Sequence, residues 1–169
     1  AYRRQRQMCI ETAEGRFKEQ ILPLTVKQGR AEKLFDTDEH VRPDVTLSDL
    51  EKLRPAFSKQ GSVTAGNASG INDGAAALVL MEENAATRRG VTPLARILAS
   101  GLGGVEPGVM GLGPVPAVNQ ALERAGLKVG DIDIIESNEA FAAQACAVGD
   151  RLGFDPVSYT HLRAHETLR

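Results

Sequence analysis

The stretch at residues 64–80 reads T-A-G-N-A-S-G-I-N-D-G-A-A-A-L-V-L. Its first part consists of small and turn-forming residues, interrupted only by Ile71, and its last part is an apolar run. Small residues let the backbone come close to a ligand or to another segment, so the first part is typical of a loop at a functional surface. The apolar run has the length of a strand and lies between turn signals, which predicts a buried strand at residues 74–81.

Two interpretations of the glycine-rich loop remain open. The loop matches neither the dinucleotide-binding pattern G-x-G-x-x-G nor the phosphate-binding pattern G-x-x-x-x-G-K-[ST], because its glycines stand at positions 61, 66, 70 and 74. A nucleotide phosphate loop is therefore not expected. The loop is either a wall along which a narrow ligand approaches the backbone, with Ser69 offering a hydroxyl group, or a plain structural turn.

Strands and helices are expected to alternate on both sides of this loop. Capping and turn residues bound the expected helices at residues 1–14, 46–53, 82–89, 116–125 and 139–152. Apolar runs predict further strands at residues 21–26, 94–100 and 132–136, and residues 29–43 are expected to form a long loop. After Pro93 the order strand, helix, strand, helix has the spacing of a βαβ unit, which predicts the α/β class with a partly parallel sheet.

The composition is that of an ordinary globular protein, with 42% hydrophobic residues, 25% charged residues and a net charge of −2. This charge gives no reason to expect a nucleic acid partner, and no apolar run is long enough to predict a membrane-spanning helix. His161 and His165 lack the zinc pattern H-E-x-x-H, so no metal site is expected. Cys9 and Cys146 form no disulfide framework, and both are expected to be core residues in a reducing compartment.

Asn138 lies where the last expected strand ends and the last expected helix begins. Ligands bind at the carboxyl ends of parallel strands, and a side-chain amide there can donate to an oxygen that gains negative charge. Asn138 is therefore a candidate for stabilising an oxyanion. The alternative is that Asn138 only caps the helix, because asparagine is favoured at that position.

Four segments of the chain carry a family resemblance. They are R-P-A-F at residues 54–57, G-S-V-T-A-G-N-A-S-G-I-N-D-G-A-A-A-L-V at 61–79, M-G-L-G-P-V-P-A at 110–117, and S-N-E-A-F-A-A-Q-A-C-A-V-G-D-R-L-G at 137–153. In this order they resemble thiolases, most closely the biosynthetic type, the acetyl-CoA acetyltransferases. The resemblance covers residues 1 to about 155 and implies part of a thiolase-type α/β fold, a mixed sheet with covering helices.

The resemblance implies that the loop of the opening stretch lines a channel for the pantetheine arm of coenzyme A. Ser69 would hydrogen-bond the arm, and Ala65 would line its path. Arg42 and Phe57 match positions that hold the adenine-nucleotide end. Small residues in the loop would then keep the channel open.

Three further residues match positions nearer to the reaction. Met110 would line the path of the arm, Phe141 would flank the acyl site, and Asn138 would hold a water that, with a histidine, stabilises the thioester oxyanion. The implied reaction is acyl transfer through a cysteine thioester, either the Claisen condensation of two acetyl-CoA molecules or its thiolytic reverse. Coenzyme A thioester is the implied substrate, and no permanently bound cofactor is expected.

The chain also departs from the family pattern. Neither Cys9 nor Cys146 lies in the motif of the family's nucleophilic or acid/base cysteine, and the G-H-P and C-x-G-G motifs do not occur. The chain by itself is therefore expected to be inactive. Residues 156–169 match nothing in a thiolase and resemble translated adapter sequence, so no element is predicted there.

These expectations divide the chain into a coenzyme-covering loop region at residues 1–70, the end of the N-terminal thiolase half at 71–90, the start of the C-terminal half at 91–155, and the tail at 156–169. Acyl-CoA is the expected ligand, and the full-length protein is expected to be a cytoplasmic dimer or tetramer. Two other functions remain open: a degradative 3-ketoacyl-CoA thiolase, and a non-catalytic thiolase-like protein that binds coenzyme A or lipid. The segment could also fail to fold alone, because half a sheet leaves open edges.

Overall fold

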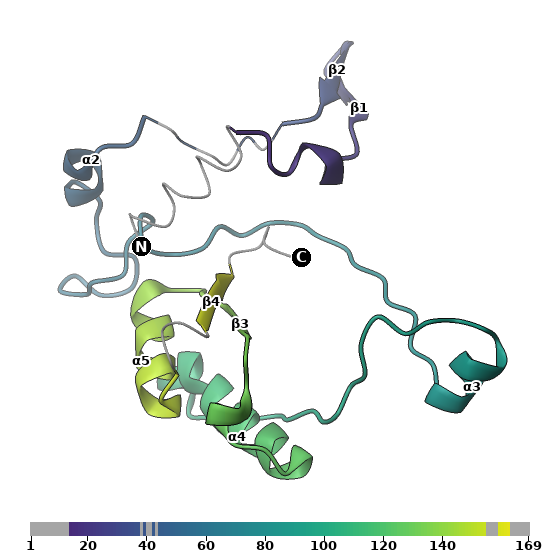
Figure 1. Cartoon of the computed structure of the whole chain (residues 1–169). Helices are drawn as coiled ribbons and strands as arrows, with labels where there is room; N and C mark the ends of the chain where they lie inside the picture. The colour runs from purple at the N-terminus through teal and green to yellow at the C-terminus, as the bar shows by residue number, and fades with distance from the viewer. Residues whose placement is uncertain (1–13, 38, 40–41, 43, 155–158, 163–169) are drawn as a thin grey trace. The chain divides into compact units, whose positions relative to one another are not determined.

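The computed structural model describes residues 14–37, 39, 42, 44–154 and 159–162 (Figure 1). The chain divides into two compact units, residues Ala1–Asn67 and Ala68–Arg169. The helix expected at residues 1–14 lies outside the described residues, apart from its last position. Gly15, expected at the end of that helix, has the left-handed backbone with a φ of 71° that such a position favours.

The first unit contains the short 3-10 helix η1 (Lys18–Gln20) and a hairpin of strands β1 (Leu24–Gln28) and β2 (Ala31–Phe35). The strands are antiparallel and join through the two-residue turn at positions 29 and 30, where Gly29 has a φ of 67°. The strand predicted at residues 21–26 is present as β1, but it begins only at Leu24, after Pro23. The long loop predicted at residues 29–43 is wrong over β2, because the turn at Gly29 folds the next residues back onto β1.

Helix α2 (Leu47–Glu51) confirms one of the two caps expected from the sequence. The Thr46 hydroxyl oxygen accepts from the Asp49 backbone N–H at 3.3 Å, and the Asp49 carboxylate accepts from the Thr46 backbone N–H at 3.0 Å. This capping box satisfies two backbone donors that the first helical turn leaves without partners. Hydrogen bonds from the Thr46 side chain and backbone lower the pKa of the Asp49 carboxyl below its ordinary value.

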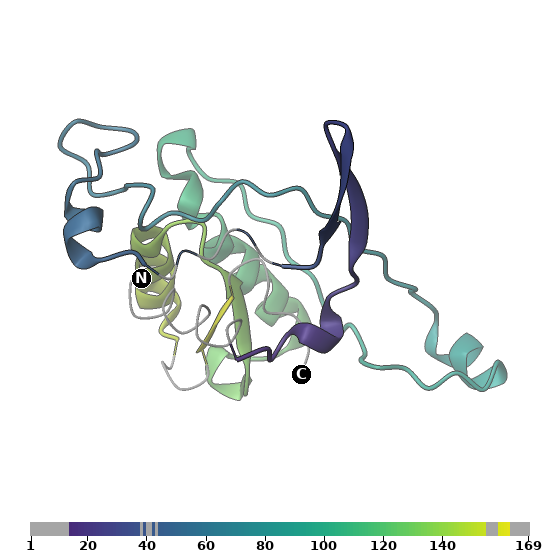
Figure 2. The same ribbon diagram turned by 90° about the horizontal axis from the view of Figure 1, so that it is seen from above.

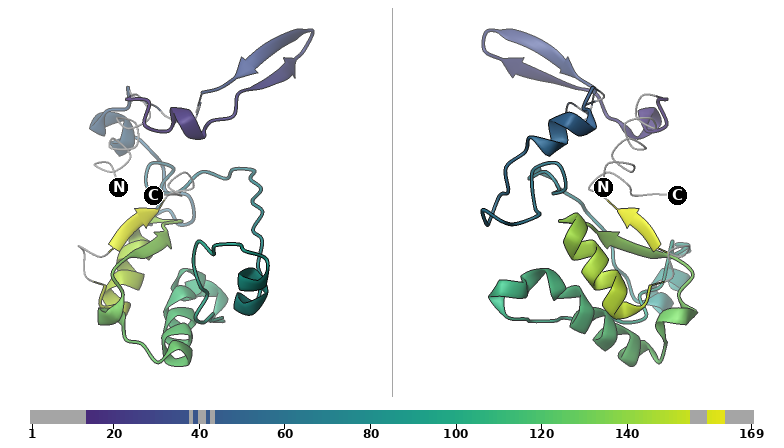
Figure 3. Two further views of the ribbon diagram at one scale, coloured as in Figure 1. Left: turned by 45° about the vertical axis from the view of Figure 1, so that its right-hand side comes forward. Right: turned by 90° about the vertical axis from the view of Figure 1, so that its left-hand side faces the viewer.

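The second unit contains α3 (Glu83–Arg88), η2 (Pro107–Leu112), α4 (Pro114–Ala125), η3 (Val129–Asp131), β3 (Ile135–Asn138), α5 (Ala142–Leu152) and β4 (Tyr159–Leu162). Strands β3 and β4 are parallel, with Ile135 beside Tyr159, so β3, α5 and β4 form a βαβ unit. Figure 3 shows α5 lying beside this strand pair. Helices α4 and α5 contact each other and η2, and the apolar face of α5 is buried at Ala145, Val148 and Leu152.

The strands predicted at residues 74–81 and 94–100 are wrong. Figure 2 shows both segments as extended chain on either side of α3, and neither pairs with another described strand. Their large apolar side chains are exposed, with Leu78 at 87% and Leu94 at 105%. An apolar run becomes a strand only where a second strand takes its backbone hydrogen bonds, and the described part of this chain offers none there.

Side chains of α4 hold the end of the second extended segment. The Arg124 guanidinium donates to the Ser100 carbonyl oxygen at 2.8 Å, and the Gln120 side-chain oxygen accepts from the Leu102 backbone N–H at 3.0 Å. The segment also lies so close to α4 that an added Cβ on Gly101 would be 1.9 Å from the Ala117 carbonyl oxygen. This close approach explains the glycine at position 101.

The tail contributes to the fold where the sequence predicts no element, because β4 lies within it and pairs with β3. Within the described residues, no helix combines the length and the apolarity that crossing a bilayer requires.

Candidate functional site

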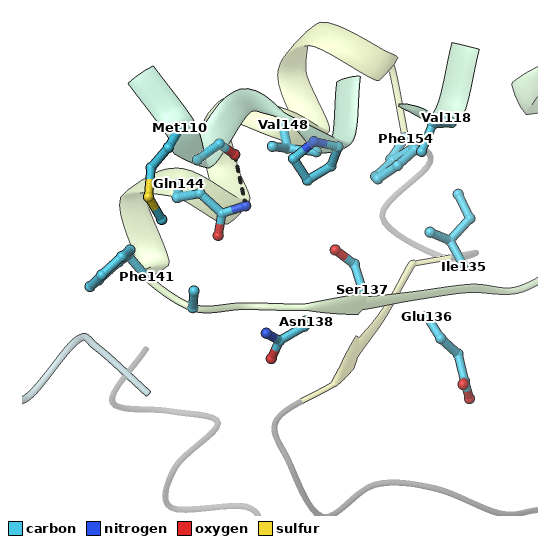
Figure 4. A pocket seen from close by; sticks show the side chains of 13 residues that line it. Met110, Val118, Ile135, Glu136, Ser137, Asn138, Phe141, Gln144, Val148 and Phe154 are labelled. Atoms are coloured by element: carbon cyan, nitrogen blue, oxygen red, sulfur yellow. Dashed lines mark hydrogen bonds between the residues drawn. The ribbon is translucent and has the colours of Figure 1, made fainter. Parts of the chain in front are cut away.

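A pocket of about 410 Å³ lies between strand β3 and the elements η2, α4 and α5. Met110 and Gly111 contribute from η2, Asn138 from the end of β3, and Phe141 and Gln144 from the start of α5 (Figure 4). Three of the residues expected from the sequence, Met110, Asn138 and Phe141, therefore line one pocket. Its volume lies within the range of small-molecule sites.

Strand β3 presents two faces to this region. Ile135 and Ser137 point toward the helices, and Glu136 and Asn138 point to the opposite side (Figure 4). The burial of the strand alternates in the same way, and the Asn138 side chain is exposed. The alternative interpretation of Asn138 as a helix cap is wrong, because α5 begins at Ala142 with Phe141 at the cap position.

The glycine-rich loop contacts the segment that leads into α5. Ala68 forms an antiparallel bridge with Phe141, and the Ser69 backbone N–H donates to the Ala140 carbonyl oxygen at 2.9 Å. Backbone pairing of this kind needs close approach, which the small residues of the loop permit. The loop is therefore joined to the residues beside the pocket, and Ser69 itself is half-buried there.

The other three expected site residues belong to the first unit. Arg42, Phe57 and Ala65 all lie in loops and are exposed, with Phe57 at 77%. Their exposure is what a contact with a solvent-facing nucleotide requires, and their roles stay predictions.

Gln144 is a site residue that the sequence interpretation missed. Its side-chain nitrogen donates to the Gly111 carbonyl oxygen at 3.1 Å, which ties α5 to η2. Its side-chain oxygen is buried and has no hydrogen-bond partner among the residues that the structure describes. The signal in the sequence was a single glutamine within the apolar helical run at residues 141–148, where a polar side chain needs a partner.

Cys146 does not occupy the core position that was expected. It is a free, exposed cysteine, because the buried face of α5 is formed by Ala145, Val148 and Leu152, and Cys146 is turned about 100° away from Ala145. Cys9 lies outside the described residues. In the described ranges, no three His, Cys, Asp or Glu side chains come together in a way that could hold a metal ion.

Comparison with known proteins shows which family this chain resembles. The description "Thiolase, N-terminal domain" matches residues 1–84, and "Thiolase, C-terminal domain" matches residues 91–162, which includes β4. The beta-ketothiolase of Cupriavidus necator is 61% identical over 143 residues, which are 84% of this chain and 36% of that protein. The acetyl-CoA acetyltransferase of Shinella zoogloeoides is 58% identical over 143 residues, which are 85% of this chain and 36% of that protein.

A solved structure agrees in fold as well as in sequence. The crystal structure of human mitochondrial 3-ketoacyl-CoA thiolase in complex with CoA superposes with a TM-score of 0.76 at 43% identity, covering 92% of this chain and 38% of that chain. This chain thus spans little more than a third of the length of the relatives it matches. Because the two family descriptions together account for nearly all of its residues, the chain belongs to the thiolase family.

Proposed function

We propose that this chain is part of an acetyl-CoA acetyltransferase, which condenses two acetyl-CoA molecules or cleaves acetoacetyl-CoA through a cysteine thioester. The observation that carries the proposal is the contact between the glycine-rich loop and the start of α5, where Ser69 donates to Ala140 beside a pocket lined by Met110, Asn138 and Phe141. A long, narrow thioester needs such a wall of small residues leading to an apolar pocket with few polar groups. The relatives named above carry the same chemistry in their names.

Each candidate site residue of the second unit has a role in this proposal. The Ser69 hydroxyl hydrogen-bonds the pantetheine arm, and Met110 and Phe141 form the apolar walls around the arm and the acyl group. Asn138 stands at the carboxyl end of β3 with an exposed amide on the face opposite Ser137, so in this proposal the water that it holds, and the thioester oxygen to which that water donates, lie at that edge of the pocket. The cysteine and histidine that complete the reaction are contributed by parts of the protein other than the residues assigned here.

The residues of the first unit act on the other end of the ligand. Arg42 supplies a permanent positive charge for phosphate oxygens, and Phe57 supplies an exposed ring against which adenine can stack. Ala65 keeps the path of the arm narrow and free of side chains. Coenzyme A is a substrate in this scheme, and no bound cofactor is needed.

The proposed oligomeric state follows from the resemblance to thiolases, and the proposed compartment follows from the cysteines. We propose that the full-length protein is a dimer or tetramer. Cys9 and Cys146 of this chain form no disulfide framework, which supports a reducing compartment, and hence the cytoplasm.

A chimera tests the proposed reaction. The matched segment of the Cupriavidus necator beta-ketothiolase is replaced by the corresponding residues of this chain, and thiolysis of acetoacetyl-CoA is measured. We expect turnover, and we expect Asn138→Ala to lower kcat by about 100-fold with little change in KM, the usual effect of removing an oxyanion donor. Asn72→Ala, in the exposed part of the glycine-rich segment, is the matched control and should leave kcat unchanged.

Other outcomes of this experiment would contradict the proposal. Faster thiolysis of long-chain 3-ketoacyl-CoA than of acetoacetyl-CoA would favour the degradative type. Binding of coenzyme A without any turnover would favour a non-catalytic binding protein. An unchanged kcat in Asn138→Ala would remove Asn138 from the mechanism.

A further inference from the structure

The two apolar walls of the pocket come from different elements that one side chain joins. Met110 belongs to η2, and Phe141 stands at the start of α5; Figure 4 shows their side chains at the same end of the pocket, beside Gln144. The Gln144 side-chain nitrogen donates to the Gly111 carbonyl oxygen at 3.1 Å, across 33 residues of sequence. This hydrogen bond therefore links the backbone next to Met110 to the helix that begins at Phe141.

Element η2 is irregular and gains much of its support from this link. Its helical run is broken at Val109, where φ is −128° and ψ is 30°, and the Met110 side chain is 67% exposed. Within the described residues, Gln144 is the only side chain that hydrogen-bonds to η2. The position of Met110 over the pocket thus depends on a bond made by its neighbour Gly111.

The approach between Gln144 and η2 is as close as a glycine permits. A Cβ on residue 111 would lie 2.7 Å from Gln144 Cγ and 3.4 Å from Gln144 Cβ. Contact on one side and the hydrogen bond on the other leave η2 no room to move toward α5 and a bond to break when it moves away. Gln144 therefore sets the distance between the two walls.

Packing alone does not explain a glutamine at this position. The Gln144 side-chain oxygen is buried, and no described residue donates to it. A buried acceptor without a donor costs about as much as the hydrogen bond of the nitrogen contributes, so an apolar side chain of the same length would fill the space at least as well. What the apolar side chain could not do is fix η2 in one place, because apolar contacts have no direction.

We propose that Gln144 is a positioning residue that sets the acyl-chain selectivity of the enzyme. By tying Gly111 to α5 it keeps the walls formed by Met110 and Phe141 too close together for long acyl groups. The inference rests on the proposed function, because it requires the acyl group to lie between these walls. Gln144 itself touches no substrate in this role. A pocket rejects extra methylene groups only while its walls cannot move apart, which is what the hydrogen bond prevents.

Substrate selectivity of the chimera with the Cupriavidus necator beta-ketothiolase tests this role. The value of kcat/KM for thiolysis is measured with acetoacetyl-CoA and with 3-ketohexanoyl-CoA, which is two methylene groups longer. Gln144→Met keeps the length of the side chain and removes the donor. We expect its preference for acetoacetyl-CoA to fall about tenfold, through a faster reaction of the longer substrate, since one methylene group is worth at least that factor in a fitted pocket. The Tm should stay within about 4 °C, because the lost bond and the removed orphan oxygen offset each other.

Further variants show whether Gln144 acts through Met110. Gly111→Ala should weaken the preference in the same direction, because the new Cβ displaces Gln144. Met110→Ala removes one wall, and adding Gln144→Met to it should then change the preference no further. Two controls should keep the preference of the unmodified chimera: Gly108→Ala, where a Cβ in η2 meets nothing within 4 Å, and Gln60→Met, at an exposed loop position.

The outcomes separate this inference from the proposed function. If the chimera turns over acetoacetyl-CoA and Gln144→Met keeps its preference, the inference is wrong and the proposed function stands. Rates that fall equally for both substrates also overturn the inference, because the role of Gln144 is then only structural. So does a preference that changes as much in the Met110→Ala background as without it. If the unmodified chimera turns over neither substrate, the proposed function fails and the inference fails with it.

Discussion

The substitution Gly111→Ala tests whether η2 and α5 are packed as closely as the structure shows. The new Cβ would lie 2.7 Å from Gln144 Cγ, so the glutamine must move and its 3.1 Å bond to the Gly111 carbonyl oxygen is lost. Overpacking costs about 1–3 kcal/mol and a neutral hydrogen bond about 1 kcal/mol. We expect a loss of about 2 kcal/mol in the free energy of unfolding, because part of the strain relaxes as the bond breaks.

Thermal unfolding followed by circular dichroism measures this loss, which corresponds to a fall in Tm of about 4–8 °C for a chain of this size. Gly108→Ala is the control in the same element, since a Cβ there meets nothing within 4 Å. The cost of Gly111→Ala should largely disappear in a Gln144→Ala background, where Cγ is absent. Equal Tm values for Gly111→Ala and Gly108→Ala, or an undiminished cost in that background, would refute the close packing.

The remaining predictions concern other parts of the chain. Gly101→Ala should destabilise more than Gly104→Ala in a urea titration, because the first Cβ would meet backbone of α4 at 1.9 Å and the second meets nothing. Thr46→Ala should raise the Asp49 pKa toward its ordinary value in an NMR titration; since the folded pKa is the lower one, the capping contribution is present at neutral pH and is lost as pH falls through the folded pKa. Cys146 is exposed and should react with a thiol reagent in the folded chain at the rate of a free thiol; strong protection would contradict its placement.

Sequence alone predicted the helix ends that are marked by capping residues or by glycines. Thr46 and Asp49 form the cap that the sequence allows at the start of α2. Gly126 and Gly153 end α4 and α5 with φ values of 68° and 65°, the left-handed backbone that glycine adopts without strain. These features depend on neighbours within a few residues, so sequence alone could predict them.

The predictions that failed concern elements whose formation depends on distant partners. The run at residues 74–81 has a strand's composition, but a strand also needs a neighbour, and the described chain supplies none there. Strand β2 was interpreted as loop because the sequence at residues 29–43 is polar and aperiodic, and in the structure all five residues of the strand are exposed. Its existence follows from pairing with β1.

The residues of the candidate site also divide into some that the sequence predicted and one that it missed. Asn138, Met110 and Phe141 were assigned by resemblance, and all three line one pocket. Gln144 was missed because its partner Gly111 is 33 residues away, and no local pattern reports that contact. The side chain of Asn138 also lies on the face of β3 opposite Ser137, which follows from strand alternation only once the strand's bounds are known.

The most direct test of the account is a titration of the 169-residue chain with coenzyme A, followed by backbone amide NMR. The account predicts saturable shifts at Ser69, Met110 and Phe141, with smaller shifts in Ser69→Ala at the same ligand concentration. The control Ser62→Ala, an exposed serine in the same glycine-rich segment, should behave like the unmodified chain. Saturable binding that leaves those three residues unshifted, or no binding at all, would contradict the claim that this pocket holds a coenzyme A thioester.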